Sequence, residues 1–285
     1  MSLSGRAKLA GVMGWPVSHS RSPSLHGYWL ERYAIDGAYV PLAVQPTHLE
    51  QALRALPALG FCGVNLTVPH KEAALAFMTS VDAEARALGA INTVVVGPEG
   101  ALVGSNTDVE GFRANVEQTL PDWRLTGPAV LLGAGGAARA VAAALPSMGG
   151  RRIRLVNRNA ERAHALAEAL KPLGIAFDIL PWSARAEALD GASLLINTTV
   201  LGMAGQAPLD LALDALPRDA VVCDIVYVPL ATPLLKAAAD RGHRVVDGLG
   251  MLLHQARPGF AAWFGQTPEV TADLRAHVLA TMGAP

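Results

Sequence analysis

One stretch decides the fold of this chain: Val130-Leu131-Leu132-Gly133-Ala134-Gly135-Gly136-Ala137-Ala138-Arg139. A short apolar run, typical of a buried parallel strand, ends in a glycine cluster, and an alanine-rich helical pattern follows. Gly133 and Gly135 match the first two positions of G-x-G-x-x-G, and Ala138 takes the third as a small substitute. In such a unit the backbone approaches a pyrophosphate closely, and the helix N-terminus offers unpaired N–H groups. The stretch predicts a dinucleotide-binding turn; the alternative is a tight turn that binds nothing.

The residues downstream extend this turn into a strand–helix–strand unit. The pattern predicts a helix over 137–145 and a second parallel strand over 152–156. The chain then reads Asn157-Arg158-Asn159-Ala160-Glu161-Arg162, without the acidic residue that NAD sites usually place at the strand tip. A guanidinium can bind a 2′-phosphate through two hydrogen bonds. We therefore predict NADP, with Asn157, Arg158 and Arg162 around its phosphate; the alternative for Arg162 is an exposed helix residue without a ligand.

Composition narrows the class of protein. The chain has 285 residues, which is compatible with two domains, and its 23 basic and 24 acidic side chains argue against a nucleic-acid surface. Cys62 and Cys223 form no C-x-x-C pair and are expected to be buried thiols. The eight histidines lack metal-ligand spacing, so we expect no metal. We expect neither a secretory signal nor a membrane span, and a cytoplasmic location.

Short apolar runs alternate with helical patterns in the first part of the chain, which predicts an α/β domain with a mostly parallel sheet. We expect strands over 9–13, 38–44 and 63–66. Helices are expected over 24–33, over 47–56 with Thr47 as the cap, and from 70 or 71 to 78. The turn Gly97-Pro98-Glu99-Gly100 between 92–96 and 101–104 predicts one local antiparallel pair. A helix over 108–120 then leads out of the domain.

The second part has the pattern of a doubly wound, Rossmann-type sheet. Strands are expected near 130 and 153 and over 175–180, 194–196, 221–225 and 245–246, with helices between most of them. Two further helices, over 251–263 and near 271–281, come too late for this sheet and are expected to return to the first domain. We therefore divide the chain into residues 1–107 plus 248–285 and residues 108–247.

Polar side chains gather at the predicted strand ends of the first domain. In open parallel sheets, ligands bind beyond the carboxyl ends of the strands. We predict a pocket for a small polyhydroxylated ligand, with Lys71 above it, lined by Ser20, Ser22, Asn65, Thr67, Asn92 and Asp108. Taken singly, Ser20 and Ser22 could be turn or capping residues. Asn92 and Asn106 could be turn formers, and Lys71 could be an exposed lysine.

At these residues the chain resembles the shikimate/quinate dehydrogenase family, of which the NADP-linked shikimate dehydrogenases belong to aromatic amino-acid biosynthesis. The resemblance spans nearly the whole chain in order. It rests on Ser20-Arg21-Ser22-Pro23, Asn65-Leu66-Thr67-Val68-Pro69-His70-Lys71, Asn92-Thr93, Asn106-Thr107-Asp108, Gly133-Ala134-Gly135-Gly136-Ala137, Asn157-Arg158, Asn197-Thr198-Thr199 and Gly248-Leu249-Gly250-Met251-Leu252-Leu253-His254-Gln255-Ala256.

The resemblance implies a substrate domain, an NADP-binding domain and a role for each motif. Lys71 and Asp108 would be the catalytic pair for reduction of 3-dehydroshikimate to shikimate by NADPH. Tyr227 and Gln255 would join the substrate pocket. The cofactor site would comprise Gly133, Ala134, Gly135, Gly136, Ala137, Asn157, Arg158, Asn159, Arg162, Thr198, Gly248 and Met251. The chain departs from the family pattern at Ser105, at Asn159, which replaces a frequent threonine, at 109–111 and at Val200.

Other functions remain open at this point. A quinate or dual quinate/shikimate dehydrogenase, including one that uses NAD, would share the motifs. A non-catalytic nucleotide-binding regulator would share the fold, although it would not require Lys71 and Asp108. A folate-type dehydrogenase would lack the Ser-x-Ser-Pro segment. The sequence is compatible with a monomer or a homodimer acting on a small-molecule substrate.

Overall fold

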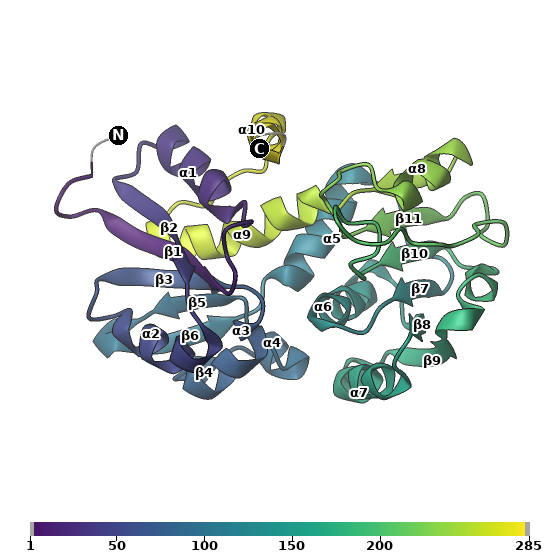
Figure 1. Cartoon of the computed structure of the whole chain (residues 1–285), viewed down its shortest axis with the longest axis horizontal. Helices are drawn as coiled ribbons and strands as arrows, with labels where there is room; N and C mark the ends of the chain where they lie inside the picture. The colour runs from purple at the N-terminus through teal and green to yellow at the C-terminus, as the bar shows by residue number, and fades with distance from the viewer. Residues whose placement is uncertain (1–2, 283–285) are drawn as a thin grey trace. The chain divides into compact units, whose positions relative to one another are not determined.

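The computed structural model describes residues 3–282. In it the chain divides into two compact units, Met1–Thr107 with Leu253–Pro285, and Asp108–Leu252. The sequence-based division has the same boundary after residue 107 but places the other after residue 247 instead of 252. Each unit contains a six-stranded sheet of its own (Figure 1).

The sheet of the first unit has the strand order β2-β1-β3-β5-β6-β4. The strands are β1 (Lys8–Gly14), β2 (Gly37–Ala43), β3 (Phe61–Leu66), β4 (Ser80–Val81), β5 (Thr93–Val96) and β6 (Leu102–Ser105). The helices of this unit are α1 (Ser22–Arg32), α2 (Leu49–Ala55), α3 (His70–Ala73), α4 (Ala83–Leu88), most of α9 (Leu249–Phe264), and α10 (Ala272–Met282).

Strand β5 is antiparallel to both of its neighbours in the first sheet. It pairs antiparallel with β6, as the hairpin turn predicted, and also with β3. The expectation of one local antiparallel pair was therefore wrong, since there are two. The turn sequence at 97–100 predicts only the pairing of β5 with β6. The pairing of β5 with β3 depends on where the hairpin packs against the rest of the sheet.

Four smaller differences separate the structure from the sequence prediction. Thr47 does not cap α2, because it lies inside a short 3₁₀ turn, Pro46–His48, and α2 begins two residues later. Strand β4 was not predicted because two residues are too few to show alternation. Helix α4 was not predicted either, although Asp82 caps it by accepting from the Ala85 N–H (2.6 Å). Cys62 is only half-buried, whereas Cys223 is buried, and both are free thiols.

The C-terminal helices pack on the first unit, as the sequence predicted. The Trp263 indole N–H on α9 donates to the Val94 carbonyl of β5 (3.0 Å). Gly63 permits this contact, because a Cβ there would lie 2.3 Å from the indole nitrogen. The Trp29 indole on α1 donates to the carbonyl of Glu269 just before α10 (3.1 Å), and α10 lies beside α1 (Figure 1).

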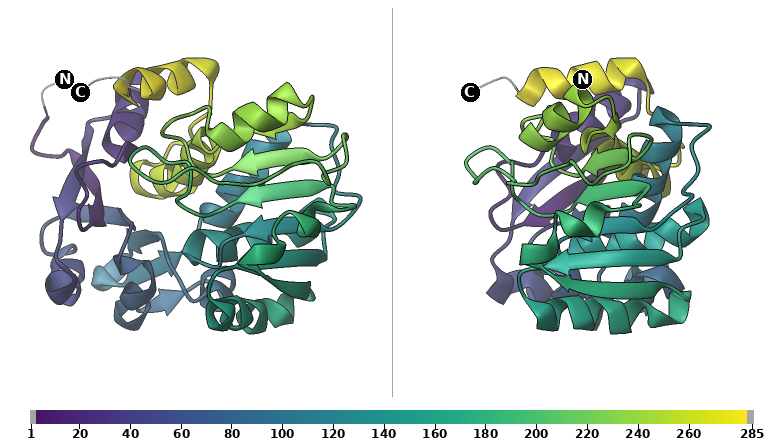
Figure 2. Two further views of the ribbon diagram at one scale, coloured as in Figure 1. Left: turned by 45° about the vertical axis from the view of Figure 1, so that its right-hand side comes forward. Right: turned by 90° about the vertical axis from the view of Figure 1, so that its right-hand side faces the viewer.

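The sheet of the second unit is fully parallel, with the order β12-β11-β10-β7-β8-β9. Figure 2 shows its strands side by side. They are β7 (Ala129–Leu132), β8 (Arg152–Asn157), β9 (Ala176–Pro181), β10 (Leu194–Asn197), β11 (Val221–Asp224) and β12 (Arg244–Val246). The helices are α5 (Asp108–Thr119), α6 (Gly136–Ala144), α7 (Ala160–Leu170) and α8 (Pro233–Asp240). This is the predicted doubly wound order, with its first strand, β7, next to the point where the order reverses.

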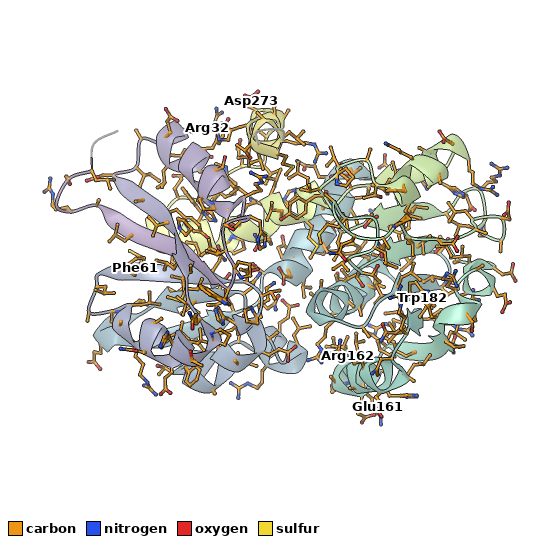
Figure 3. The ribbon with its side chains drawn as sticks, viewed as in Figure 1. Arg32, Phe61, Glu161, Arg162, Trp182 and Asp273 are labelled. Atoms are coloured by element: carbon orange, nitrogen blue, oxygen red, sulfur yellow. The ribbon has the colours of Figure 1, made fainter. Side chains whose placement is uncertain are left out.

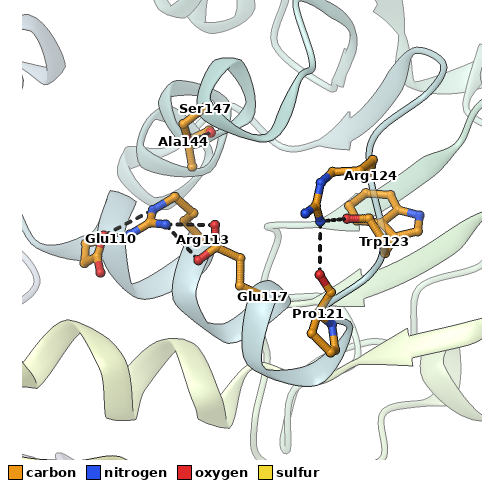
Figure 4. Close-up of polar contacts among 8 residues, drawn as sticks. All are labelled: Glu110, Arg113, Glu117, Pro121, Trp123, Arg124, Ala144 and Ser147. Atoms are coloured by element: carbon orange, nitrogen blue, oxygen red, sulfur yellow. Dashed lines mark hydrogen bonds and ion pairs between the residues drawn. The ribbon is translucent and has the colours of Figure 1, made fainter.

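Helix α5 begins the second unit and carries ion pairs on its surface. Arg113 contacts Glu110 (2.5 Å) and Glu117 (2.7 Å), one turn away on either side (Figure 4). Such exposed pairs stabilise a helix by about 0.3–0.5 kcal/mol each. Across residues 3–282, no helix has the length and apolar character needed to span a membrane.

Candidate active site

The predicted pocket residues of the first unit meet at one edge of its sheet. Strands β1 and β3 are parallel, with Met13 opposite Leu66, so both end at this edge. Strand β5 begins there because it is antiparallel: Thr93 lies opposite Asn65 on one side and Ser105, the last residue of β6, on the other. The segments that carry the predicted polar residues therefore leave or enter the sheet at neighbouring positions.

Two serines follow β1 at this edge. The Ser20 hydroxyl oxygen accepts from the Ser22 N–H (3.3 Å), which makes a local turn. Ser22 is buried and begins α1, but no side chain caps that helix. The capping role left open for these serines is therefore absent.

Asn65 is buried at the end of β3, and its amide is held on both sides. Its Nδ2 donates to the Asn92 carbonyl and to the Thr93 hydroxyl, each at 3.1 Å. Its Oδ1 accepts from the Tyr39 hydroxyl at 2.6 Å. Both N–H bonds are used, so the capacity left to Asn65 is the second lone pair of Oδ1.

Asn92 links three segments of the first unit. Its Oδ1 accepts from the Thr107 N–H (2.9 Å) and lies 3.1 Å from the Thr107 hydroxyl. Its Nδ2 donates to Oε1 of Gln255 on α9 (3.3 Å), and the Thr107 hydroxyl lies 2.7 Å from the Gln255 carbonyl. Asn92 therefore joins strand ends and α9, and the simple turn-forming role is excluded. This network also brings Gln255 to the sheet edge, and its place in a substrate pocket stays a prediction.

Lys71 lies on α3, directly after the β3 segment. The helix is anchored at its start, because His70 Nε2 lies 2.8 Å from the Val44 carbonyl. The Lys71 carbonyl accepts from the Ile91 N–H (2.9 Å), one residue before Asn92. The side chain of Lys71 is half-buried, as is that of Thr67. The backbone thus fixes Lys71 beside the entry to β5.

The predicted carboxylate partner, Asp108, is the first residue of α5 and belongs to the second unit. It is buried, with 7% of its surface exposed, and directly follows Thr107 of the Asn92 network. Its pairing with Lys71 stays a prediction.

The glycine turn of the second unit has the geometry of a phosphate-binding turn. Gly133 follows β7 with φ +104°, and a Cβ there would lie 2.8 Å from the Thr198 hydroxyl, so this position requires glycine. Gly135 is the N-cap of α6 and supplies no side-chain acceptor to the first turn. A Cβ on Gly135 or Gly136 would meet nothing within 4 Å, so open space lies over the helix N-terminus. Ala138 is fully buried, as expected for the third small position.

The residues at the tip of β8 are exposed and basic. Asn157 Nδ2 donates to the Asn159 carbonyl (2.8 Å), and Asn159 Oδ1 accepts from the Arg162 N–H (2.9 Å), so Asn159 caps α7. The Arg158 guanidinium carbon lies 5.1 Å from the ring centroid of Trp182. Figure 3 labels Arg162, Glu161 and Trp182 in this region. The open helix N-terminus and these cations fit a dinucleotide carrying an additional phosphate.

The remaining predicted residues of the second unit lie at the carboxyl ends of β10, β11 and β12. The Thr198 hydroxyl donates to the Leu132 carbonyl (2.6 Å), next to the glycine turn. Gly248 and Met251 line a small hollow with Asp224. Tyr227 follows β11 and is half-buried. A Cβ on Gly248 would lie 2.2 Å from the Ile225 carbonyl oxygen, so Gly248 also has a packing role.

Sequence reasoning missed several residues that shape these sites. Tyr39 and Thr107 position Asn65 and Asn92, and His26 stacks on Tyr39 with ring centroids 3.9 Å apart. Burial lowers the pKa of His26 to about 3, so its ring is neutral. Trp182 directly follows β9, as Arg158 follows β8. That parallel placement was the available signal for Trp182, whereas nothing local marks Tyr39.

Buried Asp224 is a further residue that the sequence did not single out. Its carboxylate accepts from Asn197 Nδ2 (3.0 Å), the Val226 N–H (3.0 Å) and the Thr232 hydroxyl (2.7 Å). Burial nevertheless raises the pKa of Asp224 to about 6. Within residues 3–282, no three His, Cys, Asp or Glu side chains form a group that could hold a metal ion.

Comparisons with known proteins point in one direction. Residues 12–94 match the family model "Shikimate dehydrogenase substrate binding domain", and residues 117–200 match "Shikimate / quinate 5-dehydrogenase". The chain is 59% identical over 278 residues to a protein of Paramagnetospirillum magneticum named shikimate dehydrogenase (NADP(+)), with 97% of this chain and 100% of the relative covered.

Solved structures of both substrate types are similar to the chain. Shikimate dehydrogenase from Thermus thermophilus in complex with NADP(H) and shikimate has a TM-score of 0.83 at 37% identity, covering 96% of this chain and 99% of that one. Quinate dehydrogenase from Corynebacterium glutamicum in complex with NAD has a TM-score of 0.90 at 32% identity, with the same coverage of 96% and 99%. Similarity of fold therefore does not separate the two substrates.

Proposed function

The chain belongs to the shikimate dehydrogenase family, and from this premise we propose that it catalyses 3-dehydroshikimate + NADPH + H⁺ ⇌ shikimate + NADP⁺. It is an NADP-dependent oxidoreductase acting on a CH–OH group, in the biosynthesis of chorismate and the aromatic amino acids. The observation that carries this function is the network of Asn65, Asn92, Thr107 and Gln255 at one sheet edge, beside Lys71.

The cofactor is NADP, which when bound supplies the hydride for the C3 carbonyl carbon. The backbone of Gly133, Ala134, Gly135, Gly136 and Ala137 would hold its pyrophosphate over the open N-terminus of α6. The exposed tip of β8 would hold the 2′-phosphate through Asn157, Arg158, Asn159 and Arg162. Asn159 Oδ1 already caps α7, so Asn159 would contribute its amide N–H groups. Thr198, Gly248 and Met251 would complete the site.

The substrate site would hold the hydroxyls and the carboxylate of shikimate. Its residues would be Ser20, Ser22, Asn65, Thr67, Asn92, Asp108, Tyr227 and Gln255. The fixed hydrogen bonds of Asn65 support one specific contact: the free lone pair of Oδ1 would accept from a substrate hydroxyl. An amide held on both sides loses little further freedom when it binds a ligand.

The proton in this reaction would pass through Lys71. As an ammonium, Lys71 would donate to the C3 oxygen during reduction, and as a neutral amine it would accept from the C3 hydroxyl during oxidation. Asp108 would orient the ammonium and the substrate hydroxyl. A positioned acid–base group of this kind typically contributes about 10²–10⁴-fold to the rate.

The same proposal implies a partner, a location and an oligomeric state for the enzyme. The partner would be a small molecule rather than a nucleic acid, as the balanced charge supports. The enzyme would work in the cytoplasm as a monomer or a homodimer. Its two free cysteines agree with a reducing compartment.

The decisive experiment follows NADP⁺ reduction by absorbance with shikimate, then with quinate, and then with each acid and NAD⁺. We expect shikimate with NADP⁺ to have the highest kcat/KM. Preference for quinate with NAD⁺ would identify the second candidate, which the similarity to the Corynebacterium enzyme favours. Cofactor binding without turnover of either acid would identify a regulator instead.

A further inference from the structure

Trp182 stands beside Arg158 because their strands end together. Arg158 directly follows β8 and Trp182 directly follows β9, and the last residues of these parallel strands, Asn157 and Pro181, are register partners. The guanidinium carbon of Arg158 lies 5.1 Å from the centroid of the Trp182 ring, within the range of a cation–π interaction. Figure 3 labels Trp182.

The Trp182 ring is itself held in place. It is half-buried and packs against the core cluster that includes Val156, Leu189 and Leu195. Arg185 also lies over the ring, 5.6 Å from its centroid. The N–H groups of Arg185 are engaged, because Nη1 donates to the Trp182 carbonyl (3.2 Å) and Nε to the Asp210 carbonyl (2.8 Å).

Arg158, in contrast, is exposed, and its side chain makes no hydrogen bond or ion pair within the part of the chain that the structure describes. The Trp182 ring is therefore the restraint on its guanidinium. A cation–π contact uses none of the guanidinium N–H groups as hydrogen-bond donors, so those of Arg158 remain available to a phosphate. Restraint before binding lowers the entropy lost when the phosphate is bound.

We propose that Trp182 is a positioning residue that strengthens the preference for NADP over NAD by holding the Arg158 guanidinium at the tip of β8. This rests on the proposed function, in which Arg158 binds the 2′-phosphate. Trp182 contacts the arginine and not the phosphate, so its effect requires Arg158 to be present.

The test measures binding of adenosine 2′,5′-bisphosphate and of adenosine 5′-monophosphate by calorimetry. The variants are Trp182→Leu, Trp182→Phe, Arg158→Ala and the double variant Arg158→Ala/Trp182→Leu. We expect Trp182→Leu to weaken the bisphosphate about two- to five-fold and to leave the monophosphate unchanged, as expected for loss of one exposed cation–π contact. Trp182→Phe should restore part of the loss. In the Arg158→Ala background, Trp182→Leu should have no further effect.

A matched control is Trp123→Leu, which alters another half-buried tryptophan of the same unit; Trp123 precedes β7, whereas Arg158 follows the parallel strand β8 at the other edge of the sheet. It should leave both affinities unchanged, and thermal melting should show that every variant is folded. KM for NADP⁺ and NAD⁺ gives a second readout: Trp182→Leu should raise only the former, with kcat unchanged.

Two results would overturn the inference while leaving the proposed function intact. If Trp182→Leu weakened binding of both nucleotides equally, Trp182 would contact the adenine or would only stabilise the fold. If the loss persisted in the Arg158→Ala background, Trp182 would act independently of Arg158. If wild-type protein bound both nucleotides equally, the 2′-phosphate site, and with it the proposed cofactor, would be wrong.

Discussion

Asn65 illustrates at the residue scale how the fold fixes a polar side chain at a strand end. An unsatisfied buried amide costs about 1–3 kcal/mol, and the three hydrogen bonds of Asn65 offset that cost while fixing its orientation. Burial raises the pKa of the Tyr39 phenol well above its usual range, so the hydroxyl stays protonated. It therefore remains a hydrogen-bond donor to Asn65 Oδ1. The orientation of the Asn65 amide thus depends on the Tyr39 phenol.

Tyr39→Phe should therefore affect both stability and substrate binding. We expect unfolding free energy to fall by about 1–3 kcal/mol, because Asn65 Oδ1 loses its buried donor. KM for shikimate should rise several-fold with kcat changing less, since the amide orients the substrate without exchanging its proton. Urea denaturation and steady-state kinetics measure the two effects. Unchanged KM would exclude Asn65 as a substrate-binding residue oriented by Tyr39.

In the proposed function, Lys71 is the residue on which the chemistry depends most. Lys71→Ala should lower kcat by about 10²–10⁴-fold with a smaller change in substrate KM, because only the proton transfer is lost. Lys71→Arg should fail as well, since a guanidinium does not release its proton at usable pH. The measurement is steady-state turnover in both directions. Turnover near that of the wild type in the alanine variant would show that another group carries the proton.

At the scale of elements, the glycine turn between β7 and α6 contains two glycines in different settings, Gly133 and Gly135. Gly133 has a positive φ and no room for a Cβ, so the fold requires it. Gly135 has an ordinary φ of −92° and open space where a Cβ would lie. In the proposed function, the absence of a side chain at Gly135 leaves room for the pyrophosphate.

Gly135→Ala should leave the folded protein as stable as the wild type but weaken NADP⁺ binding at least ten-fold, by about 1.4 kcal/mol or more, because the Cβ occupies the space of the pyrophosphate. Gly27→Ala is a matched control, since a Cβ on that glycine of α1 also meets nothing within 4 Å. Thermal melting and calorimetric titration measure the two properties. Normal NADP⁺ affinity in Gly135→Ala would place the pyrophosphate elsewhere.

The ends of β10 and β11 and the start of α8 are joined by Asp224, which makes this element pH-sensitive. An unfolded aspartate titrates near 3.9, whereas burial raises the folded pKa to about 6. Between these values the folded state binds a proton that the unfolded state has released. Unfolding free energy contributed by Asp224 therefore falls as pH rises through this window.

Between about pH 5 and pH 7, the unfolding free energy that Asp224 contributes should fall by roughly 1 kcal/mol. Comparing wild type with Asp224→Asn by chemical denaturation at both pH values isolates it, because the other titrating groups are shared. The wild type should lose more stability than the variant on going to the higher pH. Parallel pH profiles would show that Asp224 is not proton-linked to folding.

The whole molecule consists of two units, each with a six-stranded sheet of its own, and the proposed function assigns the substrate to one unit and the cofactor to the other. In the first unit, polar side chains at strand ends suit a polyhydroxylated acid. In the second, a glycine turn and basic residues suit a dinucleotide. The two ligands should therefore leave separate footprints.

Hydrogen–deuterium exchange should resolve those footprints. NADP⁺ alone should protect amides around 133–139 and 157–162, and shikimate alone should protect those around 65–71 and 92, because bound amides open less often. A ligand at 100 times its Kd adds about 2.7 kcal/mol of stability, enough to measure. Shikimate protection confined to the glycine turn would contradict the assignment of substrate to the first unit.

What the sequence determined by itself was whatever depends on neighbouring residues or on a short period. The glycine turn, the alternation of strands with helices, the hairpin at 97–100 and the basic tip of β8 are all signals of this kind. The resemblance, which rests on ordered motifs, supplied the family, and it supplied the site residues as predictions. The C-terminal helices could be assigned to the first unit because they come after the last strand of a finished sheet.

Only the tertiary structure decided which distant residues complete these features. Trp263 donates to Val94 across 169 positions, and Asn92 meets Gln255 across 163. The second partner of β5, the phenol behind Asn65 and the ring beside Arg158 leave no periodic trace, because each depends on two segments folding against each other. Such contacts follow from sheet order and packing, which only the assembled fold determines.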